Sequence, residues 1–277
     1  ILIIMKNILI TGACGFVGAR ISKYLAENGH NITAFDSYDP HAYSQWTQLM
    51  DNIVVGDIRN EDSILELTKF KFDVAIHLIS LDQNRSKKNP NYVSSINVLP
   101  TWNMLNKLTR KGLEKFIYFS TIHVYGNLPN ERITENKQAN PLNEYGLTHL
   151  MSEHICNYYN TKTKTACINA RLSNSYGSPI FKDNNCWWLV INEMCKNALE
   201  RNEIKLKSDG SPQRDFIHLD DVSRAVNVIV NNKNNFEDNI LHISSGVTMS
   251  IRELAQAVKT VFLKRYQKDV KVTYHQN

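Results

Sequence analysis

The stretch that decides the fold is Thr11-Gly12-Ala13-Cys14-Gly15-Phe16-Val17-Gly18, which fits the pattern T-G-x-x-G-x-x-G. It follows an apolar, β-branched run at residues 7–11 and opens a segment with helical spacing at residues 16–28. In this context Gly12 permits a tight turn, Gly15 lets a pyrophosphate approach the backbone, and Gly18 lets the helix pack closely on the strand. The start of such a helix also offers free N–H groups and a positive dipole end. The stretch therefore favours a dinucleotide site over a glycine turn without a ligand.

Short apolar runs alternate with helical patterns through the first half of the chain. We expect further strands at residues 31–36, 52–55, 73–78, 115–120 and 166–171, and helices at 62–70, 92–110 and 145–160. Strands separated by helices of this length need crossover connections, which build a parallel sheet covered on both faces. The predicted fold class is α/β, a Rossmann-like doubly wound parallel sheet.

The alternation becomes irregular after about residue 172. We expect residues 1–172 to form a dinucleotide-binding Rossmann domain, to which residues 214–243 return. Residues 173–277 then form mainly a smaller substrate-binding domain.

Composition excludes several classes of protein. Of 277 residues, 42% are hydrophobic and 21% charged, which is ordinary for a globular protein and excludes a disordered, collagen-like or coiled-coil chain. The net charge of +5 comes from scattered residues, so we expect no nucleic-acid partner. The five cysteines form no CxxC pair, which argues against a disulfide framework or a metal site and favours the cytoplasm. No apolar run is long enough to span a membrane, so no membrane partner is expected.

Two acidic residues follow predicted strands. Asp36 lies about twenty residues after the glycines, where a carboxylate accepts hydrogen bonds from the adenosine ribose and repels a 2′-phosphate. This position favours NAD over NADP, against the alternative of a turn or capping residue. Asp57 follows the next strand, where it could lie near the adenine or simply form a turn.

Over residues 6–254 the chain resembles the extended short-chain dehydrogenase/reductase family, in its sugar-nucleotide epimerase/dehydratase branch. The motifs that carry the resemblance occur in order: TGACGFVG (11–18), FDS (35–37), GDIRN (56–60), HLIS (77–80), NVLPT (97–101), FSTIHVYG (119–126), PLNEYGLTH (141–149), RLSNSYG (171–177), RDFIHLDDV (214–222) and HISSG (242–246). The resemblance implies NAD as cofactor. It also implies cofactor contacts from Phe16, Val17, Ile58, Leu78 and Asn97, besides the glycines, Asp36 and Asp57.

The resemblance also implies the catalytic residues. Tyr145 matches the tyrosine that exchanges a proton with a sugar hydroxyl, and Thr121 matches the hydroxyl residue that holds the same oxygen. The family has lysine four residues after the tyrosine, on the same helical face, where it binds the nicotinamide ribose and lowers the pKa of the tyrosine. Here that position is His149. An unperturbed histidine has a pKa of about 6.5, so it does not ensure a positive charge at pH 7 as a lysine does.

Three interpretations of His149 stay open. It substitutes functionally for the lysine, with a shifted pH profile. The chemistry instead needs less base strength or relies on another group. Or the protein binds NAD and is catalytically weak or inactive. His123 could also reach the site, against the alternative of a packing histidine. The dehydratases carry an Asp-Glu pair after the threonine, whereas this chain has Ile122 and His123, which argues against a 4,6-dehydratase.

On the substrate side, Asn174 and Arg214 match the residues that contact the diphosphate of a nucleotide sugar. The alternative for Arg214 is an ion pair with Asp215. Trp187 and Trp188 could stack on a base or a sugar, but an adjacent pair on a helix points in two directions, so we expect at least one of them in the core.

The sequence therefore predicts an NAD-dependent enzyme that oxidises C4 of a nucleotide-diphosphate sugar, most often to give a 4-epimerase. A dehydrogenase that releases the keto sugar and a non-catalytic NAD-binding regulator are the alternatives. The resemblance implies a homodimer formed through the helices at 92–110 and 145–160, and a place in polysaccharide biosynthesis. The sequence leaves the nucleotide and the sugar open.

Overall fold

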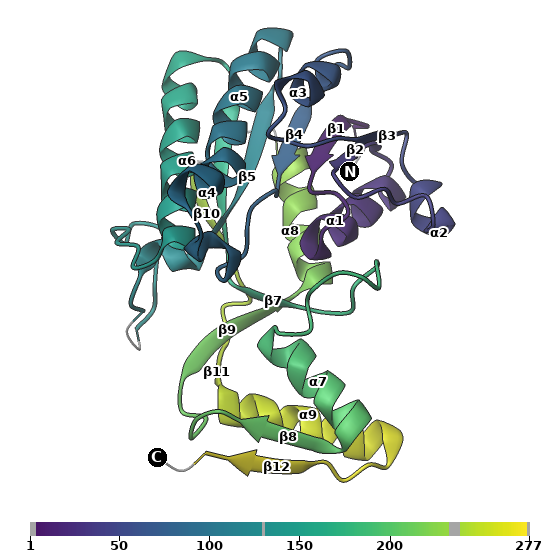
Figure 1. Cartoon of the computed structure of the whole chain (residues 1–277), viewed down its shortest axis with the longest axis vertical. Helices are drawn as coiled ribbons and strands as arrows, with labels where there is room; N and C mark the ends of the chain where they lie inside the picture. The colour runs from purple at the N-terminus through teal and green to yellow at the C-terminus, as the bar shows by residue number, and fades with distance from the viewer. Residues whose placement is uncertain (1–3, 129–130, 233–238, 276–277) are drawn as a thin grey trace.

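The computed structural model describes residues 4–128, 131–232 and 239–275. It has a larger lobe of sheet and helices and a smaller lobe that contains α7 (Val190–Arg201) and α9 (Ile251–Tyr266), as Figure 1 shows. Within the described ranges, no helix is long and apolar enough to cross a membrane.

A seven-stranded parallel sheet forms the centre of the larger lobe, in the order β10-β6-β5-β4-β1-β2-β3. Its strands are β1 (Asn7–Thr11), β2 (Asn31–Asp36), β3 (Asn52–Val55), β4 (Val74–His77), β5 (Lys115–Thr121), β6 (Ala166–Leu172) and β10 (Ile240–Ile243). The chain runs outward from β1 to β3, then crosses back to β4 and continues in the other direction. Ligands of doubly wound sheets bind at such a reversal, beyond the carboxyl ends of the strands. The predicted fold class is confirmed.

Alternate residues of β1 enter cores on opposite faces of the sheet, because side chains alternate along a strand. Ile8 and Ile10 pack in the core that includes α1 and α8, whereas Leu9 packs in the core that includes α3, α5 and α6. These helices, on the two faces of the sheet in Figure 1, are α1 (Phe16–Glu27), α3 (Glu61–Leu67), α5 (Leu99–Leu108), α6 (Glu144–Lys162) and α8 (Leu219–Asn231). Burial on both faces explains why the strands are apolar almost throughout.

The segment expected as one helix over residues 92–110 forms two helices, α4 (Pro90–Asn97) and α5. Val98 lies between them with φ −119°. Pro100 has no N–H to donate to the carbonyl of the preceding turn, and its ring collides with that carbonyl, so an unbroken helix cannot pass through it.

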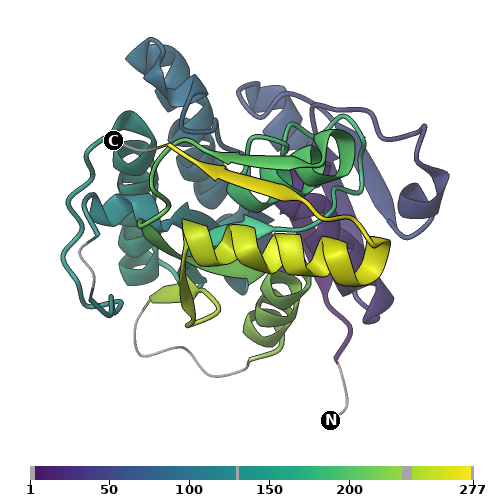
Figure 2. The ribbon, with the colours of Figure 1, turned by 90° about the horizontal axis from the view of Figure 1, so that it is seen from below.

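The smaller lobe contains two short sheets and a separate core. Its strands are β7 (Asn174–Tyr176), β9 (Gln213–His218) and β11 (Thr248–Ser250) in one sheet, and β8 (Glu203–Leu206) and β12 (Lys271–Tyr274) in the other. Figure 2 shows α9 running beside β8 and β12 at the bottom of the molecule. Between β9 and β11 the chain returns to the larger lobe, where α8 packs on α1 and β10 pairs with β6. Within residues 214–243, therefore, α8 and β10 lie in the larger lobe and β9 in the smaller one.

Candidate active site

The glycine turn between β1 and α1 has the features that a pyrophosphate needs. Gly12 has φ +76°, and a Cβ on Gly18 would lie 2.0 Å from the Gly12 carbonyl oxygen, so only glycine fits at both positions. Gly15 begins α1 without a side-chain cap, and the first turn has no acidic residue. The first N–H groups of α1 and its positive dipole end are thus left for an anion. These observations fit NAD at this turn.

Asp36 forms the turn that was one of its two expected roles, and its contact with the ribose stays a prediction. Its carboxylate accepts hydrogen bonds from the N–H of Cys14 (2.9 Å) and the N–H of Tyr38 (3.1 Å), one on each oxygen. Each carboxylate oxygen has a second acceptor position, which is available to a ribose hydroxyl. The fixed negative charge also fits NAD better than NADP.

Asp57 and Ile58 lie further from the glycine turn. Asp57 forms an ion pair with Arg59 (Nε to Oδ2, 2.9 Å), and the hydrogen bond from Arg59 lowers the pKa of its carboxyl. Ile58 is buried in the core that contains α3. Asp57 is thus paired with Arg59, and Ile58 packs in the core; their predicted contacts with the cofactor stay predictions.

A cavity of about 590 Å³ lies between the two lobes, beside the glycine turn. Among its lining are the predicted residues Gly12, Gly15, Phe16, Val17, Gly18, Leu78, Thr121, His123, Tyr145, His149 and Asn174. The predicted residues Asp36, Asp57, Ile58, Asn97 and Arg214 are not part of this lining.

Sequence reasoning missed several lining residues, among them Asp82 and Arg85 after β4, and Asn184 before α7. The residues after β4 could have been found, because the loops at the carboxyl ends of strands beside a reversal of strand order form the usual ligand site. Asn184 belongs to no motif, and only the tertiary fold brings it to the cavity.

Thr121 and Tyr145 meet at the floor of the cavity. Thr121 ends β5, and Tyr145 lies in the first turn of α6. Gly146 allows α6 to approach, since a Cβ there would lie 2.5 Å from the His123 carbonyl oxygen. Burial raises the pKa of Tyr145, a side-chain hydrogen bond with Thr121 lowers it in part, and the Asp82 carboxylate raises it further. None of these three effects comes from a cation.

His149 packs against Tyr145, with the ring centroids 4.3 Å apart. It is 1% exposed, and its Nδ1 lies 2.7 Å from the Tyr145 carbonyl oxygen. Burial lowers the pKa of His149 to about 4, so the ring is neutral at pH 7. It cannot supply the positive charge that a lysine would place at this position.

A buried ion pair supports the catalytic helix from behind. Arg171 on β6 donates Nε and Nη2 to the two carboxylate oxygens of Glu153 on α6, at 2.9 and 2.6 Å. Ser120 donates to the same carboxylate at 2.5 Å, and Arg171 also donates to the Tyr125 hydroxyl at 2.6 Å. Because Glu153 is two turns beyond Tyr145, this pair fixes α6 against the strand that ends in Thr121.

Asn97 has a structural position in the larger lobe. Its Oδ1 accepts the N–H of Leu81 (2.8 Å), and its Nδ2 donates to the Thr148 hydroxyl (3.0 Å). It therefore fastens the loop after β4 to α6, next to Tyr145 and His149. We infer that Asn97 affects the cofactor through that loop rather than by contact.

On the opposite wall, Asn174 donates Nδ2 to the Asp215 carbonyl oxygen at 2.8 Å. The alternative of an Arg214–Asp215 ion pair is wrong, because Asp215 accepts from Ser173 and Ser245 instead. Arg214 is exposed, and within the described ranges its guanidinium has no ion pair.

The tryptophan pair also differs from expectation. Trp187 and Trp188 are 40% and 44% exposed, so neither lies in the core. They fall in the irregular segment before α7, where no helical face selects one of them for burial. Trp188 lines the cavity.

A doubly wound sheet with a phosphate turn, a partly buried tyrosine beside a threonine and a cavity closed by a second lobe define a dinucleotide-dependent enzyme. The family model "NAD dependent epimerase/dehydratase family" matches residues 8–243. The chain belongs to this NAD-dependent family of sugar-nucleotide enzymes.

Curated relatives and solved structures agree with this assignment. A putative UDP-glucose 4-epimerase of Methanocaldococcus jannaschii is 29% identical over 254 residues, 91% of this chain and 81% of the relative. The fold matches UDP-glucuronic acid 4-epimerase of Bacillus cereus, solved with UDP-glucuronic acid and NAD, with a TM-score of 0.81 at 24% identity over 98% of this chain and 86% of that one. UDP-glucose 4-epimerase of Thermotoga maritima gives a TM-score of 0.83 at 22% identity, over 98% and 86%.

Proposed function

We propose that this protein oxidises C4 of a nucleotide-diphosphate sugar with NAD and returns the hydride to the opposite face, as a 4-epimerase. The observation that carries the proposal is the meeting of Thr121 and Tyr145 on one cavity with the glycine turn. The names of the curated and solved relatives, which are UDP-glucose and UDP-glucuronic acid 4-epimerases, support a UDP-hexose as substrate.

The residues of this chain divide the work between binding and proton transfer. The glycine turn and Asp36 would hold NAD, whose nicotinamide accepts and returns a hydride. Tyr145 takes the proton of the C4 hydroxyl and gives it back, while the Thr121 hydroxyl holds the same sugar oxygen.

Arg214 and Asn174 are proposed to hold the diphosphate of the substrate. The Arg214 side chain is exposed and donates Nη1 to the Gln213 carbonyl oxygen at 2.7 Å. Its other N–H groups can grip phosphate oxygens, which suits the planar guanidinium. Asn174 lines the cavity and uses one N–H of its amide on the Asp215 carbonyl oxygen, so its second N–H is left for a phosphate oxygen.

Elimination of water is not part of this proposal. The positions after Thr121 hold Ile122 and His123, so the acid pair of a dehydratase has no counterpart in this helical turn. The His123 ring lies edge-on to Tyr145, with the centroids 5.7 Å apart. This geometry supports His123 as a residue that contacts the sugar beside the tyrosine.

The experiment is to incubate the purified protein with NAD and UDP-glucose, UDP-glucuronic acid or UDP-N-acetylglucosamine, following NADH absorbance and product mass together. An isomeric product without net NADH supports the epimerase. A product two hydrogens lighter, with NADH formed, identifies the dehydrogenase that releases a keto sugar. NAD binding without turnover of a broad panel identifies the regulator and overturns the proposal.

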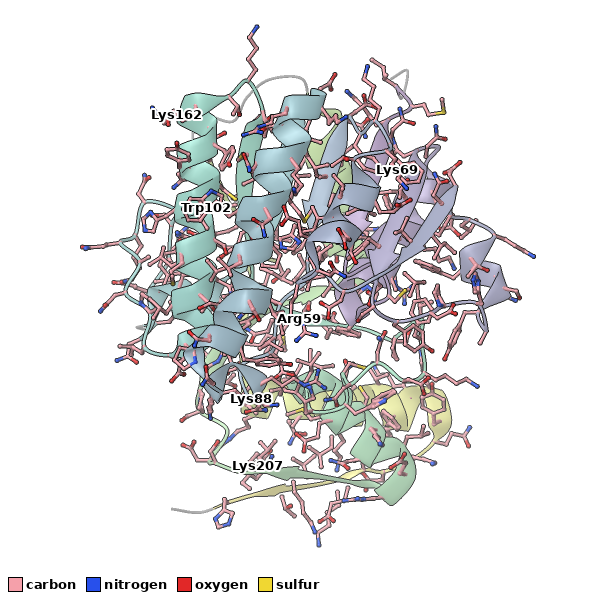
Figure 3. The ribbon with its side chains drawn as sticks, turned by 45° about the horizontal axis from the view of Figure 1, so that its top comes forward. Arg59, Lys69, Lys88, Trp102, Lys162 and Lys207 are labelled. Carbon is pink, nitrogen blue, oxygen red and sulfur yellow. The ribbon has the colours of Figure 1, made fainter. Side chains whose placement is uncertain are left out.

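We also propose a homodimer. Adjacent helices α5 and α6 carry Leu99, Trp102, Leu147, Met151 and Tyr158, all between 42% and 54% exposed. Figure 3 shows Trp102 on α5 beside α6, where it forms a side-chain hydrogen bond with Tyr159. We call these five residues the α5/α6 apolar stripe. An apolar stripe over two helices fits the same stripe of a second copy, related by a two-fold axis.

The cellular setting is proposed from chemistry alone. The five cysteine thiols are free, which suits the reducing cytoplasm. An enzyme that interconverts nucleotide sugars supplies precursors for glycosyl transfer, so we place it in polysaccharide biosynthesis.

A further inference from the structure

The protonation state of His149 follows from its hydrogen bond. Nδ1 lies 2.7 Å from the Tyr145 carbonyl oxygen, which can only accept, so Nδ1 must carry a hydrogen. In a neutral imidazole the other nitrogen then has none. Nε2 of His149 is therefore an acceptor, whereas a lysine at this position would be a donor.

The surroundings keep this ring neutral. The titratable groups that face His149 are Tyr145 and Glu153 on its own helix, His123 after β5, Tyr118 on β5 and His77 on β4. Burial lowers the pKa of His149 to about 4, the hydrogen bond to the Tyr145 carbonyl and the Glu153 carboxylate raise it, and His123 lowers it. Glu153 is already paired with Arg171, which limits the charge that it offers to the imidazole.

Tyr145 needs such an acceptor. Burial raises the pKa of Tyr145 from its ordinary value, so the side chain is a neutral phenol at pH 7. The phenol can therefore take a proton from the sugar only if it passes its own proton on. His149 Nε2 makes no hydrogen bond within the described chain, and the residue lines the same cavity as Tyr145.

We propose that His149 is the proton acceptor of Tyr145 and a catalytic residue in its own right, rather than a substitute for a lysine cation. This inference rests on the proposed function. During oxidation the O–H bond of the C4 hydroxyl breaks and its proton goes to Tyr145 Oη. The phenol's own proton goes to His149 Nε2, directly or through one water, and the C4 hydride goes to NAD. The imidazolium returns its proton by the same path when the sugar is reduced.

The first test reads the imidazole without any turnover. In protein labelled with ¹⁵N-histidine, the signal lost in His149→Gln is assigned to His149 and followed by NMR from pH 8 to pH 5, without and with NAD. His154→Gln, at the exposed face of the same helix, is the matched control for losing a histidine. We expect one protonated Nδ1 and one unprotonated Nε2 at pH 7. A doubly protonated ring, or a hydrogen on Nε2 alone, at pH 7 would overturn the inference.

The second test separates binding from proton transfer in the same variants. Glutamine offers an acceptor oxygen at about the reach of Nε2 but cannot take up a proton. His149→Gln should keep NAD affinity within about threefold of wild type and lose about 10²-fold in kcat, the usual size of a general-base contribution. A kcat close to wild type would show that His149 only positions the ligand.

The two tests also separate this inference from the proposed function. A neutral ring with Nδ1 protonated, in a protein that epimerises no sugar, would remove the proposed function and with it the catalytic role, but leave the acceptor state established. A charged ring in a protein that does epimerise would remove only the role proposed for His149.

Discussion

His149 and His77 are buried near Tyr145, and burial lowers their pKa values to about 4 and about 3. In the unfolded chain both titrate near 6.5. Below pH 6.5 the unfolded state therefore binds more protons than the folded state, and stability falls as the pH falls. Each of the two contributes about 1 kcal/mol to this loss between pH 6.5 and 5.5.

His149→Gln should remove its share of this acid sensitivity. We expect the fall in unfolding free energy between pH 6.5 and 5.5, measured by urea denaturation, to be about 1 kcal/mol smaller in His149→Gln than in wild type. His154→Gln serves as the control. Equal pH slopes in wild type and His149→Gln would mean that the buried ring titrates as in the unfolded chain.

Tyr145→Phe removes one hydroxyl and little else. The ring remains to pack against His149, so we expect an unchanged fold and NAD affinity within about threefold of wild type. Turnover should fall by at least about 10²-fold, because the sugar proton loses its acceptor. Steady-state kinetics and NAD titration of the one variant measure both values. Turnover at the wild-type rate would exclude the proton role of Tyr145.

At the scale of elements, the segment between β7 and α7 fastens the smaller lobe to the NAD-binding turn. Phe181 is 1% exposed, and its ring centroid lies 4.6, 5.2 and 5.8 Å from those of Tyr43, Trp46 and Tyr38. Three residues on, Asn184 donates Nδ2 to the Cys14 carbonyl oxygen within the glycine turn at 2.9 Å. We call Phe181 and Asn184 the β7–α7 clasp, which holds this segment against the glycine turn and its neighbouring loop.

Phe181→Ala should open that clasp. We expect NAD to bind about tenfold more weakly, which corresponds to a loss of about 1.4 kcal/mol of binding free energy. NAD retained after desalting, and the NAD dissociation rate by fluorescence, measure the effect. Phe181→Leu keeps apolar contact and should lose less. If both variants retain NAD as wild type does, the clasp does not hold the cofactor.

Local rules were sufficient for the glycine turn and for the strands expected at residues 7–11, 31–36, 52–55, 73–78, 115–120 and 166–171, because buried parallel strands are apolar throughout. They did not separate α4 from α5 within residues 92–110. They were insufficient where tertiary contacts decide. Asn97 belongs to a recognised motif, yet its amide is used by Leu81 and Thr148. Phe181 belongs to no motif, and only the fold brings it to three aromatic rings. The role proposed for His149 depends on the hydrogen bond at its Nδ1, which sequence spacing cannot predict.

At the scale of the whole molecule, the larger lobe carries two different surfaces. One edge of its sheet meets the smaller lobe at the cavity, and the outer side of α5 and α6 carries the α5/α6 apolar stripe. Because Glu153 ties α6 to β6, a partner that packs on α6 would also hold the helix that positions Tyr145. Assembly and catalysis are then coupled through one helix.

A dimer that forms through the α5/α6 apolar stripe predicts the effect of a negative charge at the centre of that stripe. Trp102→Glu replaces a large exposed aromatic ring on α5 with a carboxylate, which a second copy cannot bury without a partner. A residue at the centre of an interface contributes about 2 kcal/mol or more, so we expect the dimer dissociation constant to rise about 30-fold or more. Sedimentation velocity over a concentration series measures it, with Val228→Glu, at an exposed position on α8, as the control. A wild-type protein that sediments only as a monomer would refute the dimer, whereas a dimeric Trp102→Glu protein would place its interface elsewhere.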